Sequence, residues 1–465
     1  MTVPPRLARF FEPGSAPQQL SARLAAAGHR AYLVGGSVRD AFMDRGEVGD
    51  VDIATDARPE AVAELVKEWA DSVWLQGQRF GTIGCTKNGE TFEITTFRAE
   101  VYHPESRKPT VTYSDDIETD LSRRDFTVNA MAIALDEPEL VDPFHGIEDL
   151  AAKRLRTPLA PEVSFGDDPL RMLRAARFVA TLEFEPDAAL VDAIVAMRDR
   201  LSIISAERIR DELSKMLLAR DPSPGLWLIA ETHLSDEFLP ELNAMRLEQD
   251  PIHRHKDVLA HTIAVVAKTS PNLTVRLAAL LHDVGKPATR GFGPQGVSFH
   301  HHEVVGARMT KQRMQALRFP TAMVEDVTQL VYLHLRFHTY RMGWTDSAVR
   351  RYVRDAGDLL DELNELTRCD CTTRNAKKAQ ALARRMDELE ARIAELAEQE
   401  ELAKIKPPLD GVEIMEFLGI APGPVVGEAR SFLLDLRLDE GPMEKDVAYE
   451  RLAAWARERG LETKG

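Results

Sequence analysis

The stretch RAYLVGGSVRDAFM at residues 30–43, followed by DVDIATDA at residues 50–57, decides the fold of the first part of the chain. An apolar run, a pair of glycines and a mixed segment predict a strand, a tight turn and the start of a helix. The alternation of polar and apolar residues in the second stretch predicts a short strand. This order of elements is typical of an α/β module.

The neighbouring sequence extends the same module. Helices are predicted over residues 17–28 and over residues 57–70, the second with a proline in its first turn. Residues 73–100 are rich in strand-forming residues, with a hairpin turn predicted at Asn88-Gly89. We therefore expect α/β structure over residues 30–150.

The character of the sequence changes near residue 155. Apolar residues recur there with the period of a helix, and this pattern continues to the end of the chain. The clearest helical segments cover residues 169–182, 187–201, 206–219 and 376–404. The fold class is therefore predicted as α+β, with an N-terminal α/β head followed by all-helical domains.

The composition is that of an ordinary globular protein. The chain has 465 residues, of which 44% are hydrophobic and 29% are charged, which suits roughly two to four domains. No run approaches the ~20 apolar residues that span a bilayer, so we exclude a transmembrane protein. Because the first twenty residues lack an apolar signal core and the three cysteines are too few for a disulfide framework, we expect a cytoplasmic protein.

The net charge of −16 by itself argues against nucleic-acid binding, because phosphate groups attract Lys and Arg. Arginines nevertheless gather locally, while much of the acidic excess lies elsewhere. The clusters are Arg123–Arg124, Arg171/Arg174/Arg177 and Arg350/Arg351/Arg354. A local basic groove on an acidic protein is therefore compatible with the sequence.

A glycine turn forms one half of the first candidate site. Gly35 and Gly36 lie between the predicted strand and helix, where backbone N–H groups can approach a phosphate closely. Arg39 follows at a spacing that can add a charged contact to the same phosphate. The alternative is a turn that needs its glycines for backbone geometry alone.

Carboxylates form the other half of this site. Asp50 and Asp52 are two residues apart on the predicted strand, so they face the same side. They repel each other unless a cation lies between them, and Mg²⁺ binds carboxylates together with substrate phosphates. Glu93, in the alternating segment FEITTF, is a candidate third carboxylate from a neighbouring strand. These candidate catalytic residues suit two-metal nucleotidyl transfer, and the alternatives are a solvated acidic turn and a surface strand residue.

A second candidate site begins with Arg124 and Asp125 in the segment RRDFTVNAMAIAL, residues 123–135. We expect an amphipathic buried element here, with the arginines near a triphosphate and the acid near a ribose hydroxyl. The alternative is that Asp125 only caps a helix.

An arginine stripe follows in the predicted neck. Asp168 precedes Pro169, the predicted first helical residue, and Arg171, Arg174 and Arg177 then recur every three residues along one side of the helix. The stripe is either a solvated edge or an anion-binding wall. A carboxylate and a guanidinium together can bind the amine and the ring nitrogen of cytosine or adenine. Uracil and guanine present the reverse polarity, so such a pair would admit CTP and ATP without a nucleic-acid template.

Seven motifs occur in one order over residues 30–220: LVGGSVRD, DVDIATDA, EITTFR, RRDFTVNAMA, DPFHGIEDL, DDPLRMLRAARF and SAERIRDELSKML. Together they resemble the class II CCA-adding tRNA nucleotidyltransferase and bacterial poly(A) polymerase family. That family belongs to the polymerase-β-like nucleotidyltransferase superfamily. The resemblance implies addition of CCA to tRNA 3′ ends from CTP and ATP, with Mg²⁺ as the metal. The alternatives are a poly(A) polymerase and an enzyme that adds only CC or only A.

The resemblance also implies roles for single residues. The glycine turn and Arg39 would bind the triphosphate, and Asp50 and Asp52 would hold the metal. Residues 99–120 would form a flexible loop that helps the enzyme to change from CTP to ATP. Asp167 departs from the family pattern, which more often has Glu at this position.

The remaining roles concern recognition of the nucleotide. Arg124 would contact the nucleotide, with Asp125 near its ribose. Asp168 and Arg171 would read the base, and the two following arginines, Arg174 and Arg177, would support these contacts.

A third candidate site lies in the helical region. The segment LAALLHDVGKP, which places His282 and Asp283 at the end of an apolar helix, resembles the HD phosphohydrolase superfamily. His261 and Asp370 complete a set of metal ligands. The metal, Mn²⁺, Ni²⁺ or Mg²⁺, is left open, as is whether the site is active. The alternative is that His282 and Asp283 only pair with each other.

Other side chains of this region receive weaker assignments. The HHHE run at residues 300–303 and His334 are candidates for contacts to a second metal or a phosphate. His253 and His255 are expected at the surface or at a helix start. Cys369 and Cys371 are expected to be ordinary buried cysteines.

The domain predictions combine these patterns. We predict an N-terminal helical extension over residues 1–29, a nucleotidyltransferase head over 30–155, a nucleotide-reading neck over 156–230, an HD domain over 231–375 and a helical tail over 376–465. A further alternative from another class is an HD metal phosphohydrolase whose N-terminal module only binds RNA.

Overall fold

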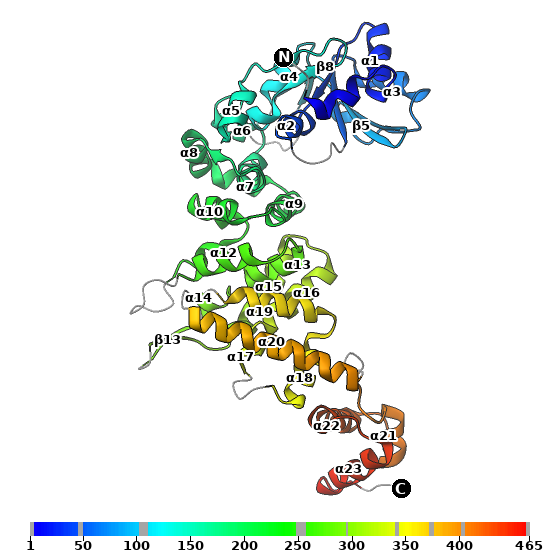
Figure 1. Cartoon of the computed structure of the whole chain (residues 1–465), viewed down its shortest axis with the longest axis vertical. Coiled ribbons are helices and arrows are strands. Elements are labelled where there is room, and N and C mark those ends of the chain that lie inside the picture. The colour runs from blue at the N-terminus through cyan, green and yellow to red at the C-terminus, as the bar shows by residue number, and fades with distance from the viewer. Residues whose placement is uncertain are drawn as a thin grey trace. The chain divides into compact units, whose positions relative to one another are not determined.

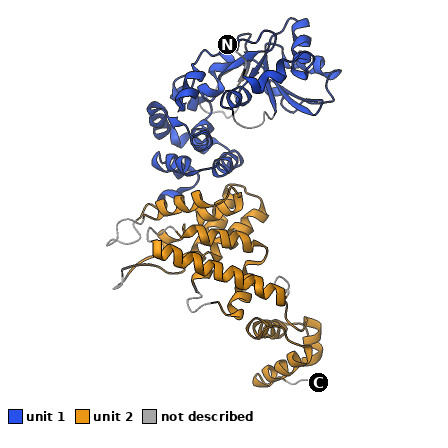
Figure 2. Cartoon of the chain, in the orientation of Figure 1, with its two compact units in different colours: residues 1–243 blue, residues 244–465 orange. Residues whose placement is uncertain are grey.

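The structure is a computed structural model that describes residues 4–44, 50–101, 110–247, 257–293, 296–339, 344–371, 376–400 and 405–461. The chain divides into two compact units, residues 1–243 and residues 244–465, which Figure 2 draws in blue and orange. Each unit contains hydrophobic core of its own.

The first unit begins with a mixed seven-stranded sheet in the order β3-β4-β5-β2-β1-β8-β9 (Figure 1). Its neighbouring strands are antiparallel, except that β2 and β5 run parallel. The strands of the sheet are β1 (Ala31–Val34), β2 (Val51–Thr55), β3 (Ser72–Trp74), β4 (Thr82–Lys87), β5 (Glu90–Thr96), β8 (Ala132–Ala134) and β9 (Leu140–Val141). Two further pairs of strands are β6 (Arg98–Val101) with β7 (Thr110–Tyr113), and β10 (Arg154–Leu155) with β11 (Glu185–Pro186).

Short helices surround the sheet, and longer ones follow it in the neck. The α-helices are α1 (Ala16–Ala26), α2 (Gly36–Phe42), α3 (Pro59–Lys67), α4 (Ile117–Ser122), α5 (Gly146–Ala152), α6 (Pro161–Asp167), α7 (Leu170–Leu182), α8 (Ala188–Met197), α9 (Ala206–Leu217), α10 (Ser223–Glu231) and α11 (Pro240–Ala244). The 3₁₀ segments are η1 (Pro5–Phe11), η2 (Gln78–Phe80), η3 (Thr127–Asn129), η4 (Arg198–Ile203) and η5 (Leu234–Glu237).

The sheet separates two apolar cores, because successive residues of a strand point to opposite faces. Ile53 and Ile94 belong to the core that α1 and α3 cover. Ala54 belongs to the other core, which includes residues of α4. Asp52 and Glu93 alternate with the first set, so their side chains lie on the second face.

Several predictions about local structure in the head are confirmed. The glycine pair follows β1 and begins α2, and the hairpin turn at Asn88-Gly89 joins β4 to β5, with φ values of +52° and +81°. Positive φ at both positions is the geometry that favours Asn-Gly in a two-residue hairpin.

Two predictions about local structure need correction. The segment 123–135 is not one element: the short η3 turn precedes the buried strand β8, because the short apolar run pairs with β1 instead of continuing as a helix. The segment 99–120, assigned to a flexible loop, contains the paired strands β6 and β7 and the start of α4. Residues 102–109 lie outside the described residues.

The second unit is a group of helices. They are α12 (Val258–Lys268), α13 (Leu273–Leu281), α14 (Lys286–Thr289), α15 (His302–Ala316), α16 (Thr321–Leu333), α17 (Arg336–Thr339), α18 (Asp346–Ala356), α19 (Leu360–Asp370), α20 (Ala376–Gln399), α21 (Gly411–Leu418), α22 (Pro424–Glu440) and α23 (Lys445–Glu458), with η6 (Gly357–Leu359). One hairpin, β12 (Arg290–Gly293) with β13 (Gly296–Phe299), interrupts them. The predicted long charged helix is α20.

Helix α13 is the centre of this unit. Residues 275–281 are buried on every side, and α12, α16 and α19 pack around the helix. The three last helices, α21 to α23, form a separate apolar core around Leu433 and Leu452. A buried ion pair from Arg350 on α18 to Glu400, which also binds Arg437 on α22, joins the two groups of helices.

The α+β class, an α/β head followed by helical domains, is confirmed. Across the described residues, no helix combines the length and the apolar character that crossing a bilayer requires. The finer domain boundaries stay predictions.

Candidate functional site

Three carboxylates meet at the junction of β2 and β5. Asp52 and Glu93 are direct partners in the parallel register, and Asp50 precedes β2 by one residue. Asp52 is half-buried, whereas Asp50 and Glu93 are exposed. Burial raises the pKa of Asp52 to about 6; Arg124 opposes this shift, and the negative charges of Glu93 and Asp50 reinforce it. A bound cation would therefore stabilise the ionised form of these three carboxylates.

The glycine turn lies directly against these acids. Gly35 has a φ of +73°, and a Cβ atom there would lie 3.2 Å from Arg124 Nη1 and 3.4 Å from Asp52 Oδ2. Glycine is required both by the positive φ and by this close approach. Arg124 is held in turn by Asp120 Oδ2, 3.2 Å from its Nη2. The turn, an arginine and a carboxylate thus share one small volume.

A hydrogen-bonded chain runs from Arg39 towards the neck. Arg39 Nη1 donates to Asn129 Oδ1 at 2.6 Å, and Asn129 Nδ2 donates to Asp125 Oδ1 at 2.9 Å. Arg174 Nε donates to Asp125 Oδ2 at 2.9 Å. Burial would raise the pKa of Asp125, but Arg174 and Asn129 outweigh it and hold that pKa below its ordinary value.

The proposal that Asp125 caps a helix is wrong. Its Oδ1 accepts from the backbone N–H of the next residue, Phe126, and Phe126 itself is the N-cap of η3. The carboxylate of Asp125 instead joins the head to the neck through Arg174.

The arginine stripe on α7 is more buried than the sequence predicted. Arg171 is 8% exposed and donates to the carbonyl and hydroxyl oxygens of Ser164 at 3.3 and 2.9 Å, and also to the Arg123 carbonyl. Arg177 Nε donates to Glu212 Oε2 at 2.5 Å. The stripe is therefore not a solvated edge but an arginine network between the head and the neck helices, and its contact with a nucleotide stays a prediction.

Asp168 and Phe178 complete this network. Asp168 ends α6, and Pro169 is the N-cap of α7, where the sequence predicted the first helical residue. Asp168 Oδ1 accepts from the Leu170 N–H at 3.1 Å. Three guanidinium groups surround the ring of Phe178 at 4.0 to 5.8 Å from its centre, those of Arg39, Arg174 and Arg177.

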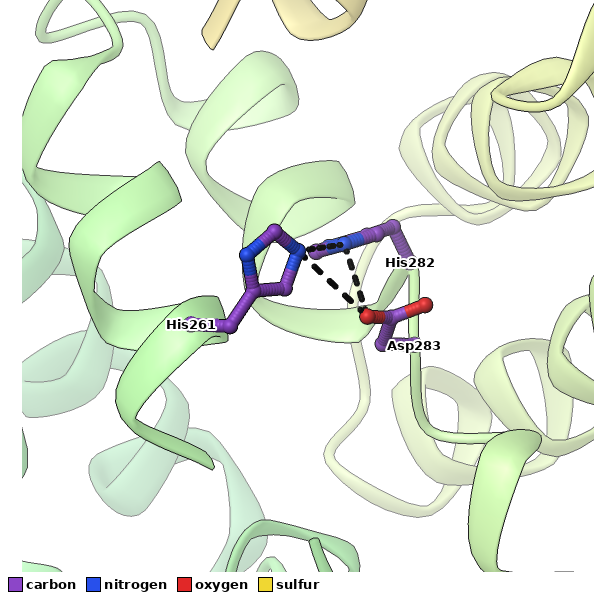
Figure 3. Close-up of side chains that lie close together, drawn as sticks. All are labelled: His261, His282 and Asp283. Atoms are coloured by element: carbon purple, nitrogen blue, oxygen red, sulfur yellow. Dashed lines mark hydrogen bonds and ion pairs between the residues drawn. The ribbon is translucent and has the colours of Figure 1, made fainter. Parts of the chain in front are cut away.

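Three of the predicted ligands of the HD site, His261, His282 and Asp283, lie close together (Figure 3). His261 lies on α12, His282 and Asp283 follow α13, and Asp370 ends α19. The Nε2 atoms of His261 and His282 are 3.3 Å apart, and His282 Nε2 lies 3.2 Å from Asp283 Oδ2. Asp370 Oδ1 lies 2.9 Å from His261 Nε2. The structure thus brings these four residues together, and their role as metal ligands stays a prediction.

A second group adjoins the first through Asp283. His302 Nε2 lies 3.4 Å from Asp283 Oδ1 and 3.2 Å from His334 Nε2. From the HHHE run, His302 enters the cluster, while the side chains of His300 and His301 are exposed. The two oxygens of Asp283 thus face two adjacent groups of histidines.

The three buried histidines share one orientation. In each of them Nδ1 lies 2.6 to 2.8 Å from the backbone carbonyl oxygen three residues earlier, so that the ring donates there and turns Nε2 inward. Such a hydrogen bond fixes the tautomer that leaves Nε2 as a metal ligand. They are His282, His302 and His334.

The charges of the cluster are strongly coupled. Burial would lower the pKa of His282, but Asp283 outweighs it and raises this pKa to about 10. Burial and the charge of His282 lower the pKa of His334 to about 3. At neutral pH the ring of His282 therefore keeps its second proton, and a divalent cation that bound in the cluster would displace this proton.

Two neighbours of the cluster carry further information. A Cβ atom on Gly285 would lie 2.2 Å from the His302 carbonyl oxygen, so this glycine allows α15 to approach the end of α13. Cys369 and Cys371, which were predicted to be buried, are both half-buried. Burial raises the pKa of the Cys369 thiol to about 11, so this thiol stays protonated at neutral pH. His253 and His255 lie outside the described residues.

The sequence analysis missed several residues that hold the sites together. Asp120, which is fully buried, binds Arg123 and Arg124, and Asn129 and Glu212 link the arginine network. Asn129 lies in the motif RRDFTVNAMA and Glu212 in the motif SAERIRDELSKML, so their place in these motifs could have identified them. Nothing local in the sequence distinguishes Asp120 from the other acids near it.

Three segments match known protein families. Residues 31–156 match the poly A polymerase head domain, residues 183–246 match the probable RNA and SrmB-binding site of polymerase A, and residues 258–401 match the HD domain.

Similar proteins are found in both sequence and structure. The A-adding tRNA nucleotidyltransferase of Deinococcus radiodurans is 34% identical over 424 residues, which cover 88% of this chain and 91% of that protein. The CCA-adding enzyme of Lactobacillus helveticus is 42% identical over 212 residues, covering 45% of this chain and 52% of that protein. The crystal structure of the Bacillus stearothermophilus CCA-adding enzyme in complex with CTP has a TM-score of 0.66 at 24% identity and covers 99% of both chains, a likeness of fold.

Replacing Asp52 by Asn tests the acidic site. In metal-free buffer at pH 7.5 we expect Asp52→Asn to raise the free energy of unfolding by about 1–2 kcal/mol, because the variant removes a carboxylate that burial and two like charges destabilise. The folded pKa is raised, so the wild type takes up a proton below pH 6 and the difference should shrink towards pH 4. Urea denaturation at several pH values measures it. Glu90→Gln on the neighbouring strand β5 is the control, and an Asp52→Asn variant that is less stable at pH 7.5 would contradict the expectation.

Replacing Gly285 by Ala tests the packing of the HD cluster. The new Cβ would meet the His302 carbonyl oxygen at 2.2 Å and the Gly306 nitrogen at 2.7 Å, both backbone atoms. We expect the free energy of unfolding to fall by about 1–3 kcal/mol in urea denaturation. The control is Gly427→Ala in α22, where no atom lies within 4 Å and where Ala should stabilise the helix by up to about 1 kcal/mol. Equal stability of the two variants would contradict the role of Gly285.

Proposed function

Because the chain belongs to the class II tRNA nucleotidyltransferase and poly(A) polymerase family, we propose that it adds CCA to the 3′ ends of tRNA from CTP and ATP. The proposal rests above all on the pairing of Asp52 with Glu93 beside Gly35 and Arg124. This geometry provides acids for a cation and a positive charge at the same point. We also propose a cytoplasmic location.

The chemistry is a nucleotidyl transfer. The terminal ribose hydroxyl of tRNA attacks the α-phosphate of the nucleotide, an O–P bond forms, and the bond to pyrophosphate breaks. Enzymes of this family need a divalent metal ion, and we propose Mg²⁺ held by Asp50 and Asp52, since oxygen ligands suit this ion. When bound, the metal would lower the pKa of the attacking hydroxyl and neutralise charge on the phosphates. Glu93 adds a third carboxylate to the same face.

The chain's own side chains position the nucleotide. The turn at Gly35 and Gly36 and the guanidinium of Arg39 would hold the triphosphate. Arg124 is oriented by Asp120 towards the same volume, and Asp125 lies where the network from Arg39 meets the neck.

Base selection would use the start of α7. Asp168 accepts hydrogen bonds, so it suits the exocyclic amine of cytosine or adenine and opposes the carbonyl oxygen of uracil or guanine. The described hydrogen bonds of Arg171 use three of the five N–H groups of a guanidinium, which leaves donors for the ring nitrogen. Arg174 and Arg177 would support the nucleotide from the same helix.

A second candidate within the family is addition of the terminal A alone. It is favoured by one observation: the relative that matches over 91% of its own length is an A-adding enzyme, whereas the match to a CCA-adding enzyme covers 52% of that protein.

The products formed on three tRNA substrates separate these reactions. With CTP and ATP, a CCA-adding enzyme extends tRNA that lacks its last three, two or one nucleotides, an A-adding enzyme extends only the substrate ending in CC, and a poly(A) polymerase makes a long oligo(A) tail. We expect the first pattern on a sequencing gel. Asp52→Asn should lower every rate at least about a hundredfold, because lost charge stabilisation is worth several kcal/mol. Retained turnover in this variant would contradict the metal assignment.

A second activity is favoured by the two histidine groups on either side of Asp283. We propose that the HD unit binds one or two divalent ions and hydrolyses a phosphate ester, independently of nucleotide addition. Nitrogen-rich ligand sets suit Mn²⁺, Ni²⁺ and similar ions better than Mg²⁺.

Replacing Asp283 by Asn tests this second activity. In an Asp52→Asn background, which weakens the head site, Asp283→Asn should reduce Mn²⁺ affinity at least about tenfold by calorimetry, because it removes the shared carboxylate. Hydrolysis of p-nitrophenyl phosphate should fall with it, while Asp283→Asn alone should leave CCA addition unchanged. His300→Ala, an exposed neighbour, is the control. Loss of addition in a folded Asp283→Asn variant would favour the HD unit as the main catalytic unit.

A further inference from the structure

Arg208 is a charged residue that none of the roles above uses. It lies on α9, and its Nη2 donates to Asp168 Oδ2 at 2.8 Å. The side chain of Arg208 is 52% exposed and that of Asp168 is 22% exposed. Ion pairs this exposed contribute little to stability, so a purely structural role does not account for a contact with this particular carboxylate.

Both oxygens of the Asp168 carboxylate accept a hydrogen bond from the protein, one of them from Arg208. One oxygen, Oδ1, accepts from the Leu170 N–H at 3.1 Å, and the other, Oδ2, accepts from Arg208. Because each carboxylate oxygen has two acceptor positions, one position on each oxygen remains for a ligand. Both donors belong to the protein, so the direction of the remaining acceptors is set before a nucleotide arrives.

Helix α9, which carries Arg208, packs against α7. Glu212, one turn further along, is 4% exposed and accepts from Arg177 on α7 at 2.5 Å. Ile209 and Leu213 of the same helix are buried. These contacts anchor α9 to α7, so the backbone of Arg208 has a defined position near the start of α7.

We propose that Arg208 is a positioning residue for base selection, which holds the Asp168 carboxylate in the orientation that accepts from cytosine or adenine and excludes uracil and guanine. This inference rests on the proposed function, because it takes Asp168 as the group that reads the base. Without Arg208, Oδ2 loses its described partner, and the carboxylate is less restrained against rotation about its Cβ–Cγ bond. If the Asp168 carboxylate can turn away, it no longer repels the carbonyl oxygen of uracil or guanine. Selectivity against the wrong nucleotides therefore falls more than the rate with the correct nucleotide does.

The test compares four forms of the full chain: wild type, Arg208→Ala, Arg208→Lys and Lys215→Ala. Lys215 is exposed on the same helix, so the last variant removes one positive charge from α9 without touching Asp168. For each form, the ratio of kcat/KM for CTP over UTP is measured on tRNA lacking CCA, and the ratio for ATP over GTP is measured on tRNA that ends in CC. Dissociation constants for CTP and UTP with Mg²⁺ are measured by calorimetry, and thermal denaturation is recorded.

Arg208→Ala should lower both selectivity ratios and the ratio of dissociation constants about ten- to a hundredfold, with kcat for CTP within about threefold of wild type and an unchanged melting temperature. Arg208→Lys should restore part of the selectivity, and Lys215→Ala should match wild type. Unchanged ratios in Arg208→Ala, or an equal fall for all four nucleotides, would overturn the inference and leave the proposed function standing. A wild type that transfers no nucleotide would overturn the proposed function, and the ratio of dissociation constants would then decide on Arg208 alone.

Discussion

The parallel pairing of β2 with β5 is the constraint on which the head depends. It brings Asp52 beside Glu93 on one face of the sheet, while Ile53 and Ile94 fill the core on the other. Burial of Asp52 and, to a smaller extent, the negative charges of Glu93 and Asp50 raise its pKa, so its ionised form is unfavourable here. Nearby positive charge from Arg124 offsets part of this effect. The fold therefore maintains a group of acids beside the Gly35 turn that a bound cation would stabilise further.

The arginine network between the head and the neck helices places positive charge inside an acidic protein. A chain with a net charge of −16 must still present cations to a nucleotide, and buried cations need partners. Asp125 and Glu212 provide these partners at the two ends of the network, with Asn129 between Asp125 and Arg39. Positive charge is thus concentrated between the head and the neck helices. The net charge of the chain therefore does not predict whether a nucleotide can bind there.

The sequence predicted those features that depend on short spacing. The alternation in residues 50–57 predicts the strand that carries Asp52, although Asp50 lies one residue before it, and the turn at Asn88-Gly89 follows from backbone preference. The convergence of the HD ligands came from a resemblance. Contacts between distant segments could not be read in the same way: Arg171 is buried because Ser164 and the Arg123 carbonyl surround its guanidinium, 7 and 48 residues away. Arg208 meets Asp168 across 40 residues, and a helical period on α9 gives no hint of this contact.

The two candidate metal sites differ in ligand chemistry, and this difference has a consequence for the whole chain. The head offers carboxylate oxygens alone, whereas the HD cluster offers the Nε2 atoms of four histidines together with Asp283 and Asp370. Hard Mg²⁺ favours the first set, and first-row transition ions favour the second, which binds them more strongly. The two units therefore differ in the ions that their ligand atoms favour, because carboxylate oxygens and imidazole nitrogens have different preferences.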